Sequence, residues 1–422
     1  MHRRRQHLCG DYGNTGFSAV KSWPLERIAH LGFRAVTAIV QSITQAELGR
    51  HRPLSFAAKT PHEFGGMRWE NLGCTEEMLA AITRQFTAMF HVDIQAPALR
   101  EETGVFVRDA LELWQAGERP VTFFTSGTTG VPKPCTHLES HLRQEITSVA
   151  PLAEDRKAAL VTAPLHHLYG FTFGLLLPLS LGIPIRSVPP LPTLVDAQMR
   201  PKDMVVGIPL LWSKLVDMKN WRTSRSDVGG DITIFTATSP IPPEILHALR
   251  NNGFRTLEFF GSSEIGVVCC RENPDEPFCL LPHVERGTGA HEGTLERLLP
   301  EGILMRYPVL DTITWFGDRL LRPGARLDNA VQVAGVNVYP QHVGSVLEKH
   351  EGVRQCWVRL MRPDEGYRLK AFIVPQPGWN EQHLRESLVL FARKHLNDAQ
   401  RPAHYTFGDD IPRGPIGKPT DW

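Results

Sequence analysis

A short polar stretch, TFFTSGTTGVPKPCTH at Thr122–His137, concentrates residue types that bind phosphate. Its hydroxyl side chains and exposed backbone N–H groups can donate hydrogen bonds to phosphate oxygens, its lysine adds positive charge, and its glycines let the backbone approach a ligand. The candidate phosphate-binding residues are Thr125, Ser126, Gly127, Thr128, Thr129, Gly130 and Lys133. The stretch is not a Walker A loop, because Lys133 lies between two prolines and is not followed by Ser or Thr. It therefore predicts a phosphate loop of another kind.

Alternating strands and helices must position this loop. The apolar run VTFF predicts a strand before it, and the spacing of apolar residues predicts helices over 76–91 and 137–149, so that the loop would lead from a strand into a helix. Further short apolar runs predict buried strands at 158–163, 204–208, 232–237 and 256–261, with helical stretches between several of them. This alternation is typical of an α/β domain.

The pattern changes near residue 328, where a shorter series of elements begins. An alternating strand from residue 330, a helix from 340 to 352, paired strands over 354–361 and 367–375, and a helix over 381–396 form a β-α-β-β-α series. We predict two domains: a large N-terminal domain of mixed sheets and helices over 1–326, and a small α+β domain over 327–422.

Bulk properties exclude several classes of protein. The chain has 422 residues and a formal net charge of +1, so no general attraction to nucleic acid or to an anionic membrane is expected. Seven scattered cysteines without a C-x-x-C pair argue against a zinc ribbon or a disulfide framework. The most apolar segment, Phe171–Ile185, is too short to span a bilayer and predicts a buried core segment. We therefore expect a cytoplasmic protein.

The string TSGTTGVPK resembles the phosphate loop of the adenylate-forming superfamily, which includes acyl- and aryl-CoA ligases, luciferases and peptide-synthetase adenylation domains. The resemblance implies that the loop binds the β- and γ-phosphates of ATP. The segments PLHHLYG, TATSPIPPEIL and FFGSSEIG resemble further motifs of the superfamily, in the same order. They imply His167 beside the acyl carboxylate, Thr238, Ser239 and Gly261 near the adenine, Ser263 at a phosphate, and Glu264 on Mg²⁺.

Downstream motifs imply the ribose site, a hinge and a catalytic lysine. Two aspartates compete for the ribose hydroxyls: Asp318 has the local Gly-Asp dipeptide, whereas Asp311 has the usual separation from Arg326, and we favour Asp311. By the same resemblance Arg326 contacts ribose and phosphate, and Asp328 is the pivot of a mobile C-terminal domain. IPRGPIGKPTDW resembles the C-terminal P-R-T-x-x-G-K motif, which makes Lys418 the adenylation lysine.

The resemblance implies a ligase that joins an acid to AMP and then to a thiol. It is greatest to the short bacterial 4-coumarate:CoA ligases, which implies an aromatic acid, ATP, Mg²⁺ and coenzyme A. Gly335 would then border the thiol tunnel, and Tyr169 and Phe171 would line the acid pocket, although such aromatic residues are often simply core. Gln332, where many CoA ligases have a basic residue, leaves open an acyl carrier protein as acceptor. Because residues 1–110 match no known pattern, a nucleotide-binding protein that catalyses no reaction is a further alternative.

Overall fold

The computed structural model describes residues 23–51, 60–125, 133–218, 231–334, 336–362, 364–412 and 422. The chain forms two compact units. The first contains the chain up to Phe124, then Pro134–Val309 and Ile313–Pro323, and the second contains Thr125–Lys133, Leu310–Thr312 and Gly324–Trp422. The predicted division at 326 and 327 into two functional domains stays a prediction.

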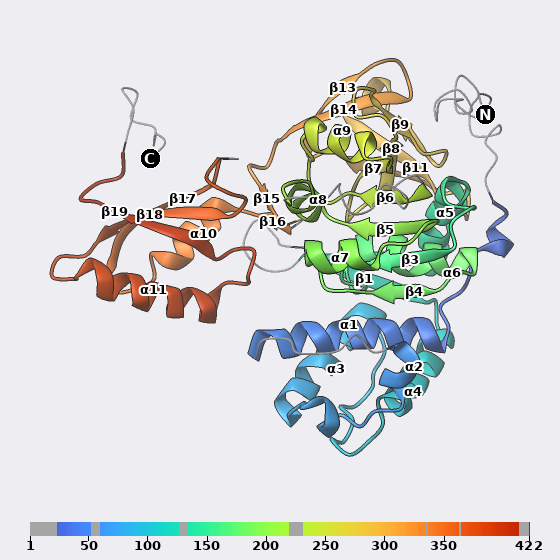
Figure 1. Ribbon diagram of the computed structural model, residues 1–422, viewed down its shortest axis with the longest axis horizontal. Coiled ribbons are helices and arrows are strands. Elements are labelled where there is room, and N and C mark those ends of the chain that lie inside the picture. The colour runs from blue at the N-terminus through green and yellow to red at the C-terminus, as the bar shows by residue number, and fades with distance from the viewer. Residues whose placement is uncertain are drawn as a thin grey trace. The chain divides into compact units, whose positions relative to one another are not determined.

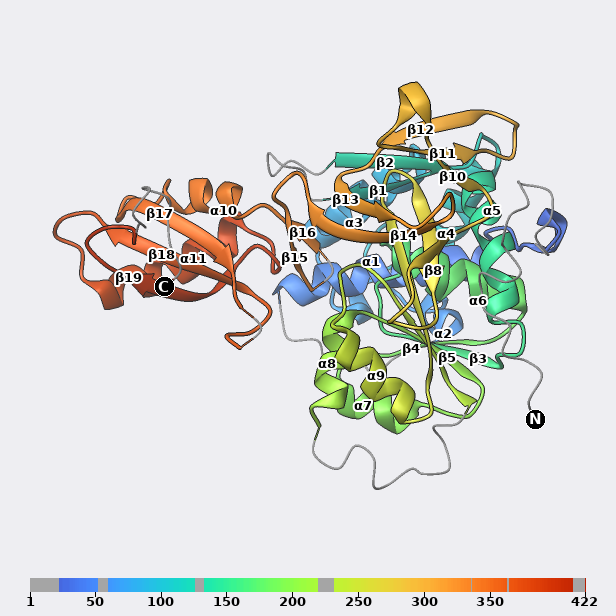
Figure 2. The ribbon, with the colours of Figure 1, turned by 90° about the horizontal axis from the view of Figure 1, so that it is seen from above.

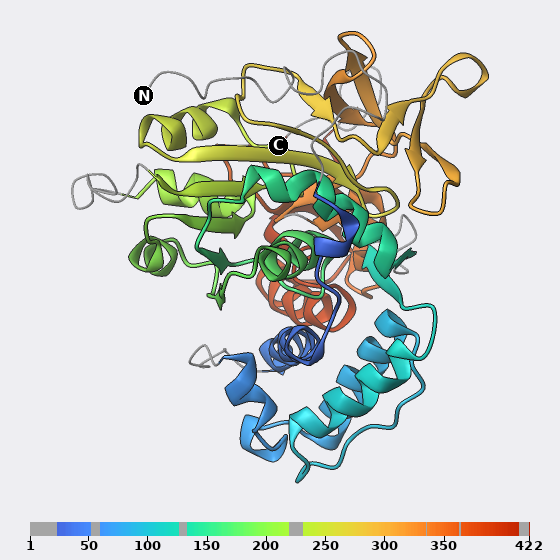
Figure 3. The same ribbon diagram turned by 90° about the vertical axis from the view of Figure 1, so that its right-hand side faces the viewer.

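Four helices open the first unit and pack together (Figures 1 and 3). They are α1 (Phe33–His51), α2 (Pro61–Gly65), α3 (Glu76–Phe90) and α4 (Thr103–Gln115). The Thr75 side chain caps α3 by accepting from the backbone N–H of Met78, as expected of a threonine at this position. Ile39, Phe86 and Phe106 from these helices are buried in the same core as Phe123 of the strand before the phosphate loop. The described helices within the unmatched residues 1–110 thus belong to the folded core of the first unit.

A nine-stranded sheet forms the centre of the first unit, in the order β13-β14-β9-β8-β7-β6-β5-β3-β4. The strands β4, β3, β5, β6 and β7 pair in parallel, and β8, β9 and β14 continue the sheet in antiparallel pairing. Their bounds are β3 (Ala158–Val161), β4 (Ile185–Ser187), β5 (Asp203–Gly207), β6 (Thr233–Thr236), β7 (Arg255–Ser262), β8 (Gly266–Arg271), β9 (Phe278–Leu280), β13 (Asp311–Trp315) and β14 (Leu320–Arg326). The predicted strands at 158–163, 204–208, 232–237 and 256–261 are confirmed.

Both faces of the parallel strands are buried, which is why they read as continuous apolar runs. In β5, Val205 packs in a core with α7 (Pro192–Gln198), α8 (Pro209–Val216) and α9 (Pro243–Asn251), whereas Met204 and Val206 belong to the core on the other face. That second core includes α5 (Glu139–Val149) and the π-helix Gly170–Leu176, which continues into α6 (Leu177–Leu181). Residues 171–178 of the apolar segment are therefore buried, as predicted, whereas residues 179–185 are half-buried or exposed.

The phosphate loop leads into a strand and not directly into a helix, which corrects our expectation. β1 (Pro120–Thr125) pairs with β2 (Lys133–Leu138), and α5 begins only at Glu139. The helical spacing over 137–149 was misleading at its start, because His137 is buried as a strand residue. A further antiparallel sheet, β10 (Val284–Arg286), β11 (Thr294–Leu298) and β12 (Leu304–Pro308), lies near β2 and α5 in Figure 2.

The second unit has its own core and confirms most of the predicted series. A hairpin of β15 (Val331–Val333) and β16 (Val336–Val338) precedes α10 (Pro340–Leu347), antiparallel strands β17 (Val353–Leu360) and β18 (Leu369–Pro375), and α11 (Glu381–His395). Three details differ from the prediction. The single strand predicted from residue 330 is the hairpin of β15 and β16, the helix α10 ends at Leu347 instead of residue 352, and an additional strand, β19 (Pro402–Phe407), pairs in parallel with β18.

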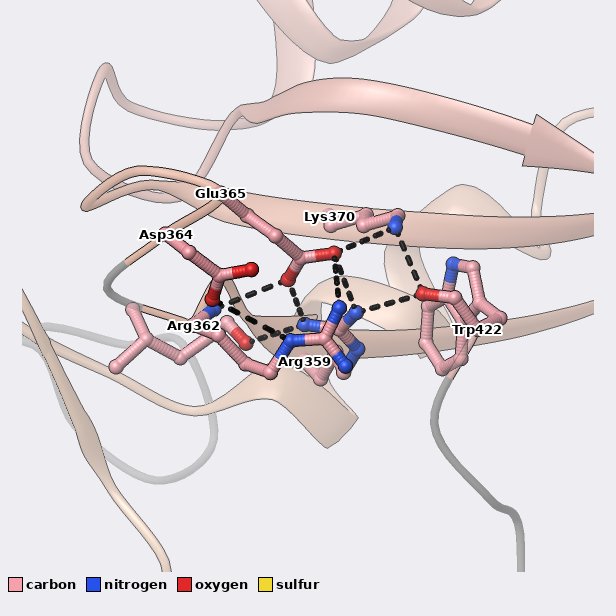
Figure 4. Close-up of polar contacts among 7 residues, drawn as sticks. Arg359, Arg362, Asp364, Glu365, Lys370 and Trp422 are labelled. Carbon is pink, nitrogen blue, oxygen red and sulfur yellow. Dashed lines mark hydrogen bonds and ion pairs between the residues drawn. The ribbon is translucent and has the colours of Figure 1, made fainter.

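Trp422 is held on the second unit by charged and aromatic groups (Figure 4). Its backbone oxygen accepts from Arg359 and from Lys370, each at 2.8 Å, and both cations also contact Glu365. The Trp422 ring packs edge-on against Phe372, with the Arg359 guanidinium 4.8 Å from the ring centroid. No helix among the described ranges is long and apolar enough to cross a membrane.

Gly170 provides a test of the packing in the segment that contains the predicted site residue His167. A Cβ atom at Gly170 would lie 2.1 Å from the backbone oxygen of Pro164, so we expect Gly170→Ala to lower the free energy of unfolding by about 1–3 kcal/mol. Urea titration followed by circular dichroism measures this change. Gly65→Ala is the control, because its Cβ would meet only side chains at 3.8 and 4.0 Å. Equal stability of the two variants would contradict the argument.

Candidate active site

The parallel strands bring several predicted residues to one edge of the sheet. His167 follows β3, Thr238 and Ser239 follow β6, and Gly261 lies near the end of β7. Because β3, β5, β6 and β7 run parallel, their carboxyl ends lie at the same edge. Ligands of open α/β sheets bind at this edge, so the topology supports one common site for these residues.

Thr238 has a strained backbone conformation. Its φ is +81°, a region that β-branched residues rarely adopt. Its hydroxyl oxygen is buried and has no hydrogen-bond partner among the described residues. Strain combined with an unpaired polar group is expected where a ligand supplies the missing partner.

The turn that carries Ser263 and Glu264 joins β7 to β8. Glycine is needed at its start, because a Cβ at Gly261 would lie 2.2 Å from the backbone oxygen of Gly266. The Ser262 hydroxyl accepts from the backbone N–H of Ile265 at 3.3 Å. Ser263 and Glu264 are half-buried, so the carboxylate of Glu264 stays within reach of solvent.

The histidine segment is held by the helix α1. The Ser42 hydroxyl lies 2.9 Å from His166 Nδ1 and accepts from the backbone N–H of Leu165 at 3.0 Å. The His167 ring lies 4.5 Å from the His166 ring. His167 is exposed, and desolvation by the surrounding protein lowers its pKa.

Tyr169 and Phe171 make the contacts of core residues. The Tyr169 hydroxyl donates toward the backbone oxygens of Gly207 and Phe235, at 2.9 and 2.8 Å, and burial raises its pKa well above the usual value. Phe171 is fully buried, with its ring 5.2 Å from that of Phe123. Tyr169 thus ties the π-helix to β5 and β6, and a pocket role for either residue stays a prediction.

The phosphate loop is only partly described. Ser126, Gly127, Thr128, Thr129 and Gly130 lie outside the described residues, as does the side chain of Thr125. Lys133 begins β2 and is exposed. On the strands that frame the loop, the Thr122 hydroxyl lies 2.7 Å from that of Thr136 and 2.6 Å from His91 Nε2. These strands are therefore connected to the end of α3.

The second unit brings Arg326, Asp328 and Asp311 together. Arg326 donates to both carboxylate oxygens of Asp328, at 2.8 and 2.6 Å, and the Tyr339 hydroxyl donates to Asp328 at 2.9 Å. The arginine bonds hold the pKa of Asp328 at about 2. Asp311 is 3.9 Å from Arg326, and burial raises its pKa. Asp318 is instead exposed in the turn between β13 and β14, and the choice of Asp311 for the ribose stays a prediction.

Two predicted residues of the C-terminal half cannot be placed. Gly335 and Lys418 lie outside the described residues. Gln332 lies in β15, and its side chain donates to Asn337 across the hairpin.

Sequence reasoning missed several residues that hold the site. Ser42, His91, His137 and Arg297 all contact segments with predicted roles. His137 is buried, donates from Nε2 to the backbone oxygen of Ser263 at 2.7 Å, and has a pKa lowered to about 4 by that burial. It stands in the quoted loop stretch, but only the fold reveals its partner.

Comparisons with known proteins decide the family. The protein-family model described as AMP-binding enzyme matches residues 81–288. The family model described as AMP-binding enzyme C-terminal domain matches residues 342–418. The chain is 34% identical over 300 residues to the 4-coumarate–CoA ligase of Halorhodospira halophila, a match that covers 71% of this chain and 74% of that protein. The chain belongs to the AMP-binding enzyme family. It is an AMP-forming acid–thiol ligase of the adenylate-forming superfamily, and ATP and CoA are substrates of the ligases in this family.

Other relatives agree with this membership. The 4-coumarate–CoA ligase of Rhodobacter capsulatus is 34% identical over 308 residues, covering 71% of this chain and 74% of that protein. Among solved structures, an amide bond synthetase from Marinactinospora thermotolerans has a TM-score of 0.60 at 23% identity, covering 71% of this chain and 67% of that one. This structural likeness confirms the fold of this AMP-binding enzyme: an α/β N-terminal domain and a C-terminal domain.

The ion pair of Arg326 with Asp328 makes stability depend on acid. A carboxylate with a lowered pKa stabilises the fold above its ordinary pKa of 3.8, and that contribution is lost as the pH falls through about 2. We therefore expect Arg326→Gln to lower the free energy of unfolding of the second unit at pH 6. The difference in this free energy between the variant and the wild type should become smaller as the pH falls from 3.8 towards 2. Urea unfolding at several pH values measures it.

The control is Arg354→Gln, because Arg354 donates to the backbone oxygen of Asp409 instead of a carboxylate. A difference that stays constant over the whole acid range would contradict the assigned pKa of Asp328.

Proposed function

We propose that this enzyme converts an aromatic carboxylic acid, 4-coumarate in the first instance, to its acyl-adenylate and then to the CoA thioester. The observation that carries the proposal is the position of His167, Thr238 and the Gly261–Glu264 turn at the carboxyl ends of neighbouring parallel strands. The choice of acid is supported by three curated relatives, each named 4-coumarate–CoA ligase, at 33–34% identity.

The carboxylate of the acid is a poor electrophile, so it must be activated before a thiol can react with it. A carboxylate oxygen attacks the α-phosphorus of ATP and pyrophosphate leaves, which gives a mixed anhydride. A thiolate then attacks the carbonyl carbon, and AMP leaves with the electron pair of the broken C–O bond. The first step brings two anions together, so a cation placed at the developing charge lowers its barrier. We assign this role to Lys418, and nucleotide binding to Thr238, Ser239, Gly261, Ser263, Asp311 and Arg326.

His167 is proposed to face the acid. Its lowered pKa keeps the imidazole neutral near pH 7, so it can donate one hydrogen bond without adding charge. Its exposed position after β3 lets a substrate carboxylate reach the ring. Alignment of the reacting atoms by such contacts accounts for much of the rate in reactions of this kind.

The residues present fit a magnesium ion. The described residues contain no group of three or more His, Cys, Asp or Glu side chains able to hold a metal, but Mg²⁺ usually needs only one or two carboxylates together with substrate phosphates and waters. Glu264 supplies such a carboxylate on a turn of restricted geometry. When bound, the ion would neutralise charge on the polyphosphate.

A carrier protein is the alternative thiol donor. The motivating residue is Gln332, a neutral side chain engaged with Asn337, where many CoA ligases have a cation. Transfer of labelled acid to a carrier protein, with none to CoA, would favour this alternative.

The substrate is tested with a panel of acids. We expect the purified enzyme to release pyrophosphate with ATP, Mg²⁺ and 4-coumarate faster than with acetate or a long-chain fatty acid. Addition of CoA should produce the thioester, detected by its shifted ultraviolet absorbance. Pyrophosphate release with another acid but not with 4-coumarate would reject the proposed substrate and keep the reaction class.

Lys418 is tested by separating the half-reactions. We expect Lys418→Ala to reduce adenylation by at least about a hundredfold, because it removes a charge from the transition state, and to leave thioester formation from supplied coumaroyl-adenylate within about threefold. Lys394→Ala, an exposed change on α11, is the control. An equal loss in both half-reactions would contradict the role of Lys418.

A further inference from the structure

The backbone on both sides of Glu264 is held by side chains from distant elements. The turn between β7 and β8 leaves the backbone oxygens of Ser263 and Ile265 pointing to partners outside the hairpin. These two oxygens flank Glu264 in the chain. What binds them therefore determines where the Glu264 carboxylate lies.

His137 holds the first oxygen. It lies in β2, the strand that leaves the phosphate loop, and its Nε2–H donates to Ser263 O at 2.7 Å. The imidazole is 4% exposed, so water does not compete for this bond. On the neighbouring position of β2, Thr136 contacts Thr122, so the strand is fastened through successive residues.

Arg297 holds the second oxygen. It lies in β11, is 1% exposed, and donates to the backbone oxygens of Ile265 and His141, the latter at 2.6 Å. Its charge is paired with Glu145 of α5, which is fully buried, at 2.7 Å. Gly266 closes against this pair, because a Cβ there would lie 1.8 Å from Glu145 Oε1. The turn thus rests on a fixed cation.

We propose that His137 and Arg297 are positioning residues that hold the backbone on either side of Glu264 and so fix its carboxylate for the metal-bound nucleotide. This rests on the proposed role of Glu264. His137 also connects that carboxylate to the strand of the phosphate loop, so the two groups that meet the polyphosphate share one rigid support. The inference differs from a role in stability alone, because it predicts a loss specific to the metal.

The test uses His137→Leu, which removes the N–H donor, and His137→Gln, which keeps an N–H at similar reach. Calorimetry of the full-length protein gives the Kd of ATP with Mg²⁺ and of ATP with EDTA. We expect His137→Leu to weaken Mg²⁺–ATP binding about tenfold, the change for ~1.4 kcal/mol, with metal-free ATP within about twofold. His137→Gln should restore Mg²⁺–ATP binding to within about threefold. His141→Leu is the control, since the His141 ring contacts only Glu301 among the polar partners described.

Two further variants distinguish a specific loss of Mg²⁺–ATP affinity from a general loss of stability. In a Glu264→Gln background, His137→Leu should cause no further metal-specific loss, because the ligand that it positions is already altered. Arg297→Lys, which keeps a charge beside Glu145 but loses the fork, should weaken Mg²⁺–ATP more than metal-free ATP. Additive losses, or equal losses with and without Mg²⁺ in folded variants, would overturn the inference.

These outcomes are separate from those of the proposed function. A wild type that binds Mg²⁺–ATP but shows no acid-dependent pyrophosphate exchange would reject the ligase reaction, and the binding comparison would still decide the role of His137. A wild type whose ATP affinity is the same with and without Mg²⁺ would overturn the positioning inference by itself.

Discussion

The parallel pairing of β4, β3, β5, β6 and β7 is the constraint on which the first unit depends. Parallel neighbours require long connections, so the chain must pass over the faces of the sheet and return between strands. The helices that make these passages bury both faces. What remains free is the edge where the strands end, and there the chain must turn with short polar segments. Thr238 and the Gly261–Glu264 turn are such segments.

The buried pair of Arg297 and Glu145 supports the turn between β7 and β8 at this edge. Two buried charges lose much hydration, and their attraction offsets that loss only when the remaining N–H groups find acceptors. Arg297 meets this requirement with the oxygens of Ile265, His141 and Gln144. A hydrophobic replacement of the pair would remove the charges, but it would also leave the backbone oxygen of Ile265, beside Glu264, without the donor that Arg297 supplies.

Sequence patterns predicted the elements that local physics determines. Apolar runs identified β3, β5, β6 and β7, and the helical spacing of apolar residues identified α3. Because the motifs follow these runs in the sequence, Thr238 lies just after β6 and Glu264 just after β7. The partners of His137, Ser42 and Tyr339 were not predictable. No spacing in the sequence shows which other segment of the folded chain will lie beside each of these side chains. β19 was missed because its sequence, PAHYTF, contains no continuous apolar run, and only its first and fourth residues are buried.

Thr238 carries a consequence for the adaptation of this enzyme to heat. A threonine at a φ of +81° is strained, and glycine would relieve that strain at no steric expense. Laboratory evolution that rewarded only thermal resistance would therefore drift towards glycine at this position and discard a buried hydroxyl. Retention of threonine in such an experiment would indicate that the proposed nucleotide contact of its hydroxyl outweighs the gain from relieving the strain.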